Sequence, residues 1–182
     1  MLSYKHGYHA GNQADVLKHI CLIQAYKSLK RHHKSISYID THAGSGDYNF
    51  KSDYMSKNKE YENGITKLES YKYENQSIKF YLKVLRNINN SKKMTFYPGS
   101  PSIISHLSDS SDKLLFYELH NNEVQLLKKH LAKQINSKIY NKDGFEFFLQ
   151  KINPKERTLV LIDPSYEIKD DFEKVVKVLK IL

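Results

Sequence analysis

Four short apolar runs that alternate with helix-like segments constrain the fold more than any other feature of this sequence. Each run is rich in Val, Ile, Leu or Tyr, and helix-like segments follow at about residues 121–133, at 145–151 and from 169 to the end. Strands that alternate with helices at this spacing form parallel βαβ units, so the sequence predicts an open α/β sheet wound in both directions. The predicted strands occupy residues 35–40, 113–118, 137–141 and 158–162.

A long polar stretch interrupts this rhythm after the first predicted strand. Residues 47–95 are rich in Tyr and Lys, and apolar side chains recur at helical spacing only around 65–71 and 78–88. We therefore expect one domain built from residues 1–46 and 96–182, with a helical insertion subdomain at 47–95. The alternative is a disordered lid in the same place.

The chain is basic and of single-domain size. Its 182 residues include 29 Lys and Arg against 20 Asp and Glu, a formal charge of +9. Clustered cations favour a polyanionic partner such as nucleic acid, because phosphate contacts release counterions. The alternative is a composition bias, since nearly all the basic residues are Lys and the chain is also rich in Asn, Ile and Tyr.

Cellular location is constrained by two features. Cys21 is the single cysteine, so an intrachain disulfide is excluded and we expect Cys21 to have a packing role. The sequence has no apolar stretch typical of a signal peptide and none approaching the roughly 20 residues of a membrane span. We expect a cytoplasmic protein without a membrane partner.

Acidic or glycine-containing segments follow all four predicted strands. These segments are residues 40–46, Glu118, Asp143-Gly144 and residues 163–166, and the carboxyl ends of parallel strands meet at one edge of a sheet. A glycine turn, a carboxylate for ribose hydroxyls and a carboxylate for an adenine amino group would form an adenosyl pocket. Several carboxylates would repel the pyrophosphate of a dinucleotide but suit the sulfonium and ammonium groups of S-adenosylmethionine.

Each element has an ordinary structural alternative. Gly44 and Gly46 occur in a pattern that is also common in plain loops, and Glu118 could be a solvated strand end. Asp143-Gly144 could be a simple turn. His19 and His42 could be structural histidines.

Chemistry is expected at Asp163-Pro164-Ser165-Tyr166, directly after the last predicted strand. The lone pair of an exocyclic adenine amino group is delocalised into the ring, so the amino group is a poor nucleophile. If the carboxylate of Asp163 and the carbonyl of Pro164 accept its two hydrogens, the developing positive charge is stabilised. Tyr166 would stack on the base once the base has left its helix. The alternative is a strand followed by a proline turn.

Eight short motifs, in order along the whole chain, resemble one known family. They occupy residues 2–6, 9–12, 14–19, 40–44, 97–101, 118–120, 143–145 and 162–164. The family is the bacterial 23S ribosomal RNA adenine-N6 methyltransferases of the RlmJ type. The resemblance implies a Rossmann-like methyltransferase fold with its first four strands in the order 3-2-1-4. It also implies transfer of a methyl group from S-adenosylmethionine to adenine 2030 of 23S rRNA, with S-adenosylhomocysteine as product.

The resemblance also assigns residues. It implies Asp163 as catalytic acceptor beside Pro164 and Tyr166, and RNA contacts by Tyr4 and Lys18. We expect no metal, and a monomer if the chain is complete. The residues expected to contact the cofactor are His19, His42, Ser100, Glu118, Asp143, Gly144 and Asp163.

This chain departs from the family in two ways. The family has a second proline where this chain has Ser165, and serine frees the backbone of the turn. Family members are also about one and a half times as long and have seven strands, of which this sequence shows four. We therefore expect a C-terminally truncated chain that lacks the last strands. The alternative to an active enzyme is a non-catalytic remnant that binds RNA, the cofactor or both.

Overall fold

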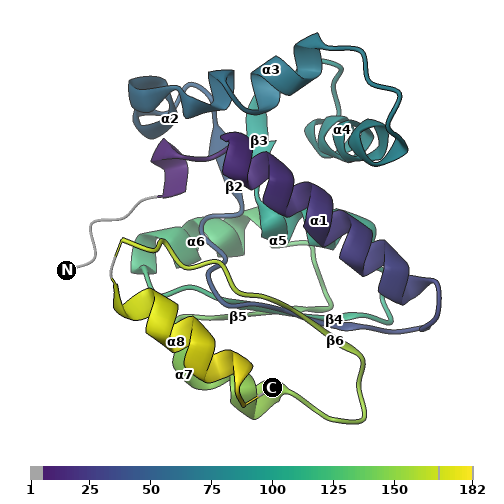
Figure 1. The fold of residues 1–182 in the computed structure, drawn as a ribbon, viewed down its shortest axis with the longest axis vertical. Coiled ribbons are helices and arrows are strands. Elements are labelled where there is room, and N and C mark those ends of the chain that lie inside the picture. Colours follow the sequence, from purple (N-terminus) through teal and green to yellow (C-terminus); the bar gives the residue numbers. More distant parts are fainter. Residues whose placement is uncertain (1–5, 168, 182) are drawn as a thin grey trace.

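A four-stranded parallel sheet organises the computed structural model, which describes residues 6–167 and 169–181 (Figure 1). Its strands are β1 (Ser37–Asp40), β4 (Lys113–Tyr117), β5 (Ser137–Tyr140) and β6 (Thr158–Leu161). The strands lie side by side in the order β5-β4-β1-β6, and all three pairings are parallel. Counted along the chain, this is the predicted order 3-2-1-4, so the predicted fold class is confirmed.

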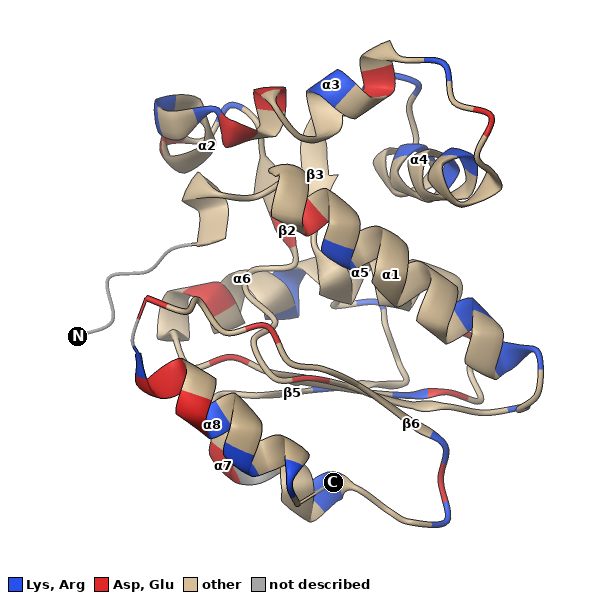
Figure 2. Ribbon diagram, in the orientation of Figure 1, with Lys and Arg blue, Asp and Glu red and all other residues tan. Residues whose placement is uncertain are grey.

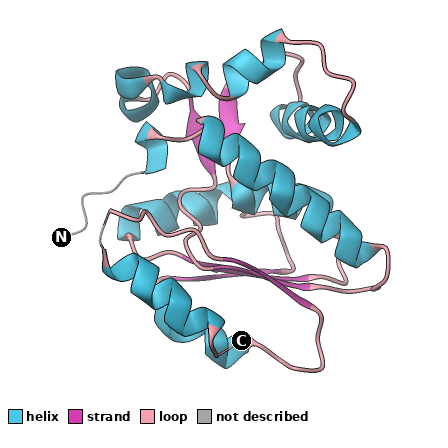
Figure 3. Ribbon diagram, in the orientation of Figure 1, coloured by secondary structure: helices cyan, strands magenta, loops and turns pink. Residues whose placement is uncertain are grey.

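Helices cover both faces of this sheet (Figure 3). Successive side chains of a strand point to opposite faces, so Tyr38 packs on one side and Ile39 on the other. The first face packs against α1, α5 and α6, and the second against the α7 region and α8. These helices are α1 (Gln13–Lys30), α5 (Ser100–Leu107), α6 (Asn121–His130), α7 (Gly144–Phe147) and α8 (Asp170–Leu179).

Residues 47–95 form a layer on the far side of α1 from the sheet (Figure 1). Two of its helices, α3 (Ile65–Ser70) and α4 (Gln76–Asn89), confirm the helices expected there. Buried side chains such as Tyr81 and Leu85 form a second core with Ile23 of α1. The remaining elements are the 3₁₀ helices η1 (His6–Tyr8), η2 (Glu60–Glu62) and η3 (Phe148–Lys151), α2 (Asp53–Asn58), and strands β2 (Asp47–Asn49) and β3 (Phe96–Pro98).

The antiparallel pair of β2 and β3 was not expected from the sequence. Tyr48 lies opposite Tyr97 in this pair, and both rings are buried. The pair brings the two ends of the 47–95 segment together beside the turn that follows β1, where the segment leaves and rejoins the rest of the chain. The division into a domain of residues 1–46 and 96–182 and an inserted subdomain stays a prediction.

The prediction that Cys21 has a packing role is wrong. Cys21 lies on α1 but is exposed, whereas its neighbours Leu22 and Ile23 are buried. The helical rotation of about 100° per residue turns Cys21 away from both cores. Across the helices of the described residues, none has the length and apolar character needed to cross a membrane.

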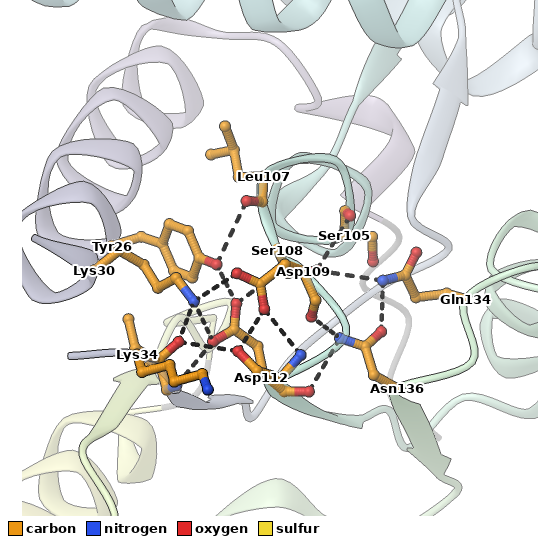
Figure 4. Close-up of polar contacts among 12 residues, drawn as sticks. Tyr26, Lys30, Lys34, Ser105, Leu107, Ser108, Asp109, Asp112, Gln134 and Asn136 are labelled. Carbon is orange, nitrogen blue, oxygen red and sulfur yellow. Dashed lines mark hydrogen bonds and ion pairs between the residues drawn. The ribbon is translucent and has the colours of Figure 1, made fainter.

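A polar cluster ties the elements together at the amino ends of the strands (Figure 4). The side chain of Asp112 is fully buried and accepts hydrogen bonds from the hydroxyl of Tyr26, from Lys30 Nζ at 3.0 Å and from the backbone N–H of Ile36 at 2.8 Å. Burial, together with the hydrogen bond to Asp112, raises the pKa of Tyr26. One carboxylate therefore fixes α1 to the start of β1 and to the loop before β4.

We expect Asp112→Ala to lower the free energy of unfolding by about 3 kcal/mol, because it leaves buried donors without an acceptor. Asp109→Ala is the matched control, since Asp109 contacts the same Lys30 from a side chain that is 58% exposed. Asp109→Ala should lower the free energy of unfolding much less, because an exposed ion pair is weakened by solvent. Urea denaturation of both variants checks this, and equal losses would contradict the role assigned to Asp112.

Candidate active site

A cavity lies at the carboxyl ends of the sheet strands, beneath α1. It is lined by the loops that follow β1, β4, β5 and β6, by the start of α5 and by Lys18 and His19 of α1. All the residues expected to contact the cofactor line this cavity. These are His19, His42, Ser100, Glu118, Asp143, Gly144 and Asp163.

The glycine turn after β1 is fixed by Glu118. Gly44 has a φ of 61°, and a side chain there would collide with the hydroxyl of Tyr48. The backbone N–H of Gly44 donates to Glu118 Oε2 at 2.8 Å, and that of His120 donates to Oε1 at 2.8 Å. Burial raises the pKa of Glu118, and these two N–H groups oppose the shift. Glu118 is therefore held in a fixed position in the cavity wall and is not a solvated strand end.

Asp143 and Gly144 join the end of β5 closely to the first strand. Asp143 caps α7 by accepting a hydrogen bond from the N–H of Phe145 at 2.8 Å. A side chain on Gly144 would collide with the backbone of Thr41, so only glycine permits this approach. The ring of His42 packs edge-on against Phe145 at 4.8 Å. The segment is thus a tightly packed joint between two strand ends.

Asp40 positions two residues of the cavity without lining it. Its buried carboxylate accepts hydrogen bonds from Ser100 Oγ at 2.7 Å, from the hydroxyl of Tyr38 at 3.0 Å and from the N–H of His42 at 3.2 Å. Burial raises the pKa of Asp40 to about 6. The carboxylate at the end of β1 therefore acts through Ser100 and His42.

His19 lies in the roof of the cavity and is 1% exposed. Its Nδ1 is 2.8 Å from the hydroxyl of Tyr97, which in turn is 3.0 Å from that of Tyr81. In the described part of the chain, its Nε2 has no hydrogen-bond partner. Burial and the charge of Lys18 lower the pKa of His19 to about 3, so the ring is neutral at physiological pH. A buried ring nitrogen without a partner is suited to a polar ligand in the cavity.

Lys18 connects α1 to the end of β6. Its ammonium group lies 2.6 Å from Asp163 Oδ2 and 2.6 Å from Asp15 Oδ1. Burial alone would lower the pKa of Lys18, but the two carboxylates outweigh it and raise that pKa. Asp15 also accepts hydrogen bonds from His6 Nε2 and from the N–H of Gly11, both at 2.9 Å. Burial would raise the pKa of Asp15, but His6 and Lys18 hold it well below its usual value.

The first residues after β6 face the cavity, but the aromatic residue that follows them does not. Asp163, buried Pro164 and Ser165 line the cavity. Tyr166 does not: it has a φ of 56°, and its ring packs against Phe172 at 4.7 Å. A positive φ is uncommon for a non-glycine residue and marks local strain. Tyr4, the other aromatic residue expected near the substrate, lies outside the described residues.

Other lining residues were not anticipated from the sequence. Asp171 and Lys174 come from the start of α8, where Figure 2 shows acidic residues along the approach to the helix. Their position in the sequence could have identified them, because a helix that follows a strand of a parallel sheet begins near the carboxyl end of that strand. Thr41 and Ala43 belong to the expected segment 40–46, and the remaining unanticipated lining residues are His6, Tyr48, Gly99, Leu119, His120, Glu123 and Phe145. Among the residues that the structure describes, no cluster of His, Cys, Asp and Glu is arranged to hold a metal.

Comparisons with known proteins converge on one family. A family model described as "Ribosomal RNA large subunit methyltransferase D, RlmJ" matches residues 33–181. Proteins named ribosomal RNA large subunit methyltransferase J from Haemophilus influenzae and Escherichia coli are 40% and 38% identical over 182 and 177 residues. These matches cover 99% and 97% of this chain but 65% and 63% of the relatives.

A solved structure has the same fold. The crystal structure of protein LPL1258 from Legionella pneumophila matches with a TM-score of 0.83 and 35% identity. The match covers 94% of this chain and 64% of that one. The chain therefore spans about two thirds of the length of the proteins it is similar to.

The raised pKa of Asp40 gives a stability that falls as the pH rises. The folded pKa is about 6 and the ordinary value is 3.8, so between these values the folded chain binds more protons than the unfolded chain. From pH 4 to pH 7, the unfolding free energy of the wild type should fall by about 2 kcal/mol relative to that of the non-titrating Asp40→Asn variant. Urea denaturation across this range measures it, and a constant difference would contradict the assignment.

Proposed function

The chain belongs to the RlmJ family of ribosomal RNA large subunit methyltransferases, and we propose that it methylates the N6 amino group of adenine 2030 in 23S rRNA. The methyl donor would be S-adenosylmethionine. One observation carries the proposal: Asp163 and Pro164 lie in the same cavity as the glycine turn and the acidic ends of the neighbouring strands. This arrangement supports the proposal, because the expected acceptor of the amino hydrogens would lie beside the expected adenosyl pocket.

The polar side chains that line the cavity fit S-adenosylmethionine. Glu118 would accept the ribose hydroxyls, and Asp143 would accept the adenine amino group. Ser100, His42 and the unpaired Nε2 of His19 would bind the polar amino acid end. The bound cofactor supplies a methyl group on a positively charged sulfur, and the surrounding carboxylates favour that charge. Gly44 and Gly144 let the strand-end loops pack closely around the cavity in which the nucleoside would bind.

Asp163 and Pro164 would orient the target amino group. Lys18 holds Asp163 Oδ2, which leaves Oδ1 and the carbonyl of Pro164 to accept the two N6 hydrogens. These acceptors turn the nitrogen lone pair toward the methyl group and stabilise the positive charge that develops on N6. The carboxylate of Asp163 would also receive the proton that N6 must lose.

Aromatic residues would hold the base in the site. We propose that Tyr166 stacks on the unpaired adenine, which requires its ring to turn away from Phe172. Stacking between aromatic side chains is the usual way in which an extruded base is held. The contacts of Tyr4 and Lys18 with RNA stay predictions, and in this structure Lys18 is bound by two carboxylates.

A second function is favoured by Ser165, which stands in the turn that would orient the acceptors and leaves the backbone of that turn freer than proline would. A remnant with this cavity would bind RNA or the cofactor without transferring the methyl group. Comparing cofactor binding with methyl transfer separates the two functions.

We expect Asp163→Asn to reduce methyl transfer by at least about 100-fold, since it removes a charged acceptor of the amino hydrogens. Incorporation of tritiated methyl groups into unmethylated 23S rRNA measures this. Asp170→Asn is the matched control, because Asp170 is exposed and lies outside the cavity. No methyl transfer by the wild type would support the remnant function, and equal rates in wild type and Asp163→Asn would refute the role of Asp163.

We expect Ser165→Pro to increase methyl transfer with little change in cofactor affinity. The Ser165 hydroxyl accepts only a long hydrogen bond, 3.4 Å from the N–H of Glu167, so it constrains the turn weakly. Proline would restrict the turn and reduce the entropy lost on ordering it. Single-turnover methylation of rRNA by the two proteins tests this, and equal rates would show that serine is no handicap.

A further inference from the structure

A second cavity lies beside the candidate active site and has no part in the proposed methyl transfer. Its volume is about 460 Å³, within the range of small-molecule sites. Tyr48 and Glu123 line both cavities, so only a shared wall separates the two. The other lining residues are Gly7, Ser45, Asp47, Asn49, Ser52, Tyr54, Phe96, Leu126 and His130.

Aromatic rings come into this cavity from three elements. Tyr48 lies on β2, Phe96 on β3 and Tyr54 on α2. Tyr54 packs edge-on against Tyr8 at 5.1 Å, and 37% of its surface remains exposed. Rings held in this way offer flat apolar surfaces on which a planar ligand can stack.

The carboxylate of Asp47 gives the cavity its polarity. Asp47 Oδ1 is buried, and within the described residues it has no hydrogen-bond partner. Burial raises the pKa of Asp47, although the nearby Ser102 hydroxyl and His130 oppose the shift. His130 itself is held by the carbonyl of Ser45, 2.7 Å from its Nδ1. An unsatisfied buried carboxylate oxygen requires a hydrogen-bond donor.

The charges around the cavity select the part of a nucleotide that can enter. Asp47 and Glu123 inside would repel a phosphate, whereas an amino group on a base edge would suit Asp47. Lys51 and Lys57 are exposed on the chain that flanks Ser52 and Tyr54, where they can meet the phosphates outside. A base pointing inward with its backbone outward matches this arrangement.

We propose that the second cavity binds one unpaired nucleobase of the RNA, a near neighbour of the target adenine, and that the exocyclic amino group of this neighbouring base donates to the carboxylate of Asp47. The base would stack against Tyr54 or Phe96. The inference rests on the proposed function and deepens it, because it assigns recognition of the surrounding sequence to a pocket separate from the reaction.

The test is RNA binding, measured by fluorescence anisotropy in the presence of S-adenosylhomocysteine. The probe is a synthetic 23S rRNA fragment that carries the target adenine, and an abasic nucleotide is moved through the two positions on either side of that adenine. We expect one position at which base removal weakens binding to the wild type about tenfold or more. In Asp47→Ala, the intact RNA should bind equally weakly, and the same base removal should have no further effect.

Two further variants complete the experiment. Asp53→Ala is the matched control, because Asp53 is exposed at the start of α2 outside the cavity, and it should bind RNA like the wild type. Leu126→Trp, which adds bulk at a 44% exposed lining residue, should weaken RNA binding even if Asp47→Ala does not fold. S-adenosylhomocysteine affinity should not change in either cavity variant.

The outcomes separate this inference from the proposed function. If the wild type methylates the RNA but no abasic position couples to Asp47 or Leu126, the second cavity is not a base pocket and the proposed function stands. If RNA binding shows the coupling but no methyl is transferred, the pocket stands and the catalytic proposal fails. Absence of RNA binding by the folded wild type overturns both.

Discussion

The parallel register of β1 with its two neighbours is the constraint on which the site depends. Asp40 of β1 lies level with Phe116 of β4 and Leu161 of β6. The residues that follow each strand therefore emerge at the same height, and Glu118 and Asp163 reach one cavity from opposite sides of β1. A shift of register would move these carboxylates apart and turn the strand side chains to the wrong face.

The roof of the cavity contains charged side chains that are buried and are kept ionised by their partners. Lys18 and Asp15 are both largely buried on α1, and burying either charge alone would cost several kcal/mol. Their pairing, with His6 and Asp163 as further partners, keeps both groups ionised. The same contacts fix α1 over the end of β6, so the helix cannot move without exposing an unpaired charge. His19, one residue further on, is kept neutral by the same surroundings.

The sequence predicted the main sheet because its strands are apolar and end in acidic or glycine residues. β2 and β3 were missed because each has three residues, and their pairing is set by contacts between Tyr48 and Tyr97 far apart in the chain. Cys21 was misplaced because α1 packs against two cores and leaves only a narrow exposed stripe. The ring of Tyr166 points away from the cavity because the residue has a positive φ, which no sequence pattern predicted.

Direct calorimetric titration of the folded 182-residue chain with S-adenosylhomocysteine tests the central claim, that the strand-end cavity is an adenosyl site. The account predicts one site per chain, with affinity weakened by Glu118→Gln and unaffected by Glu62→Gln, an exposed glutamate of η2 outside the cavity. Absence of binding, or binding insensitive to Glu118, would contradict it.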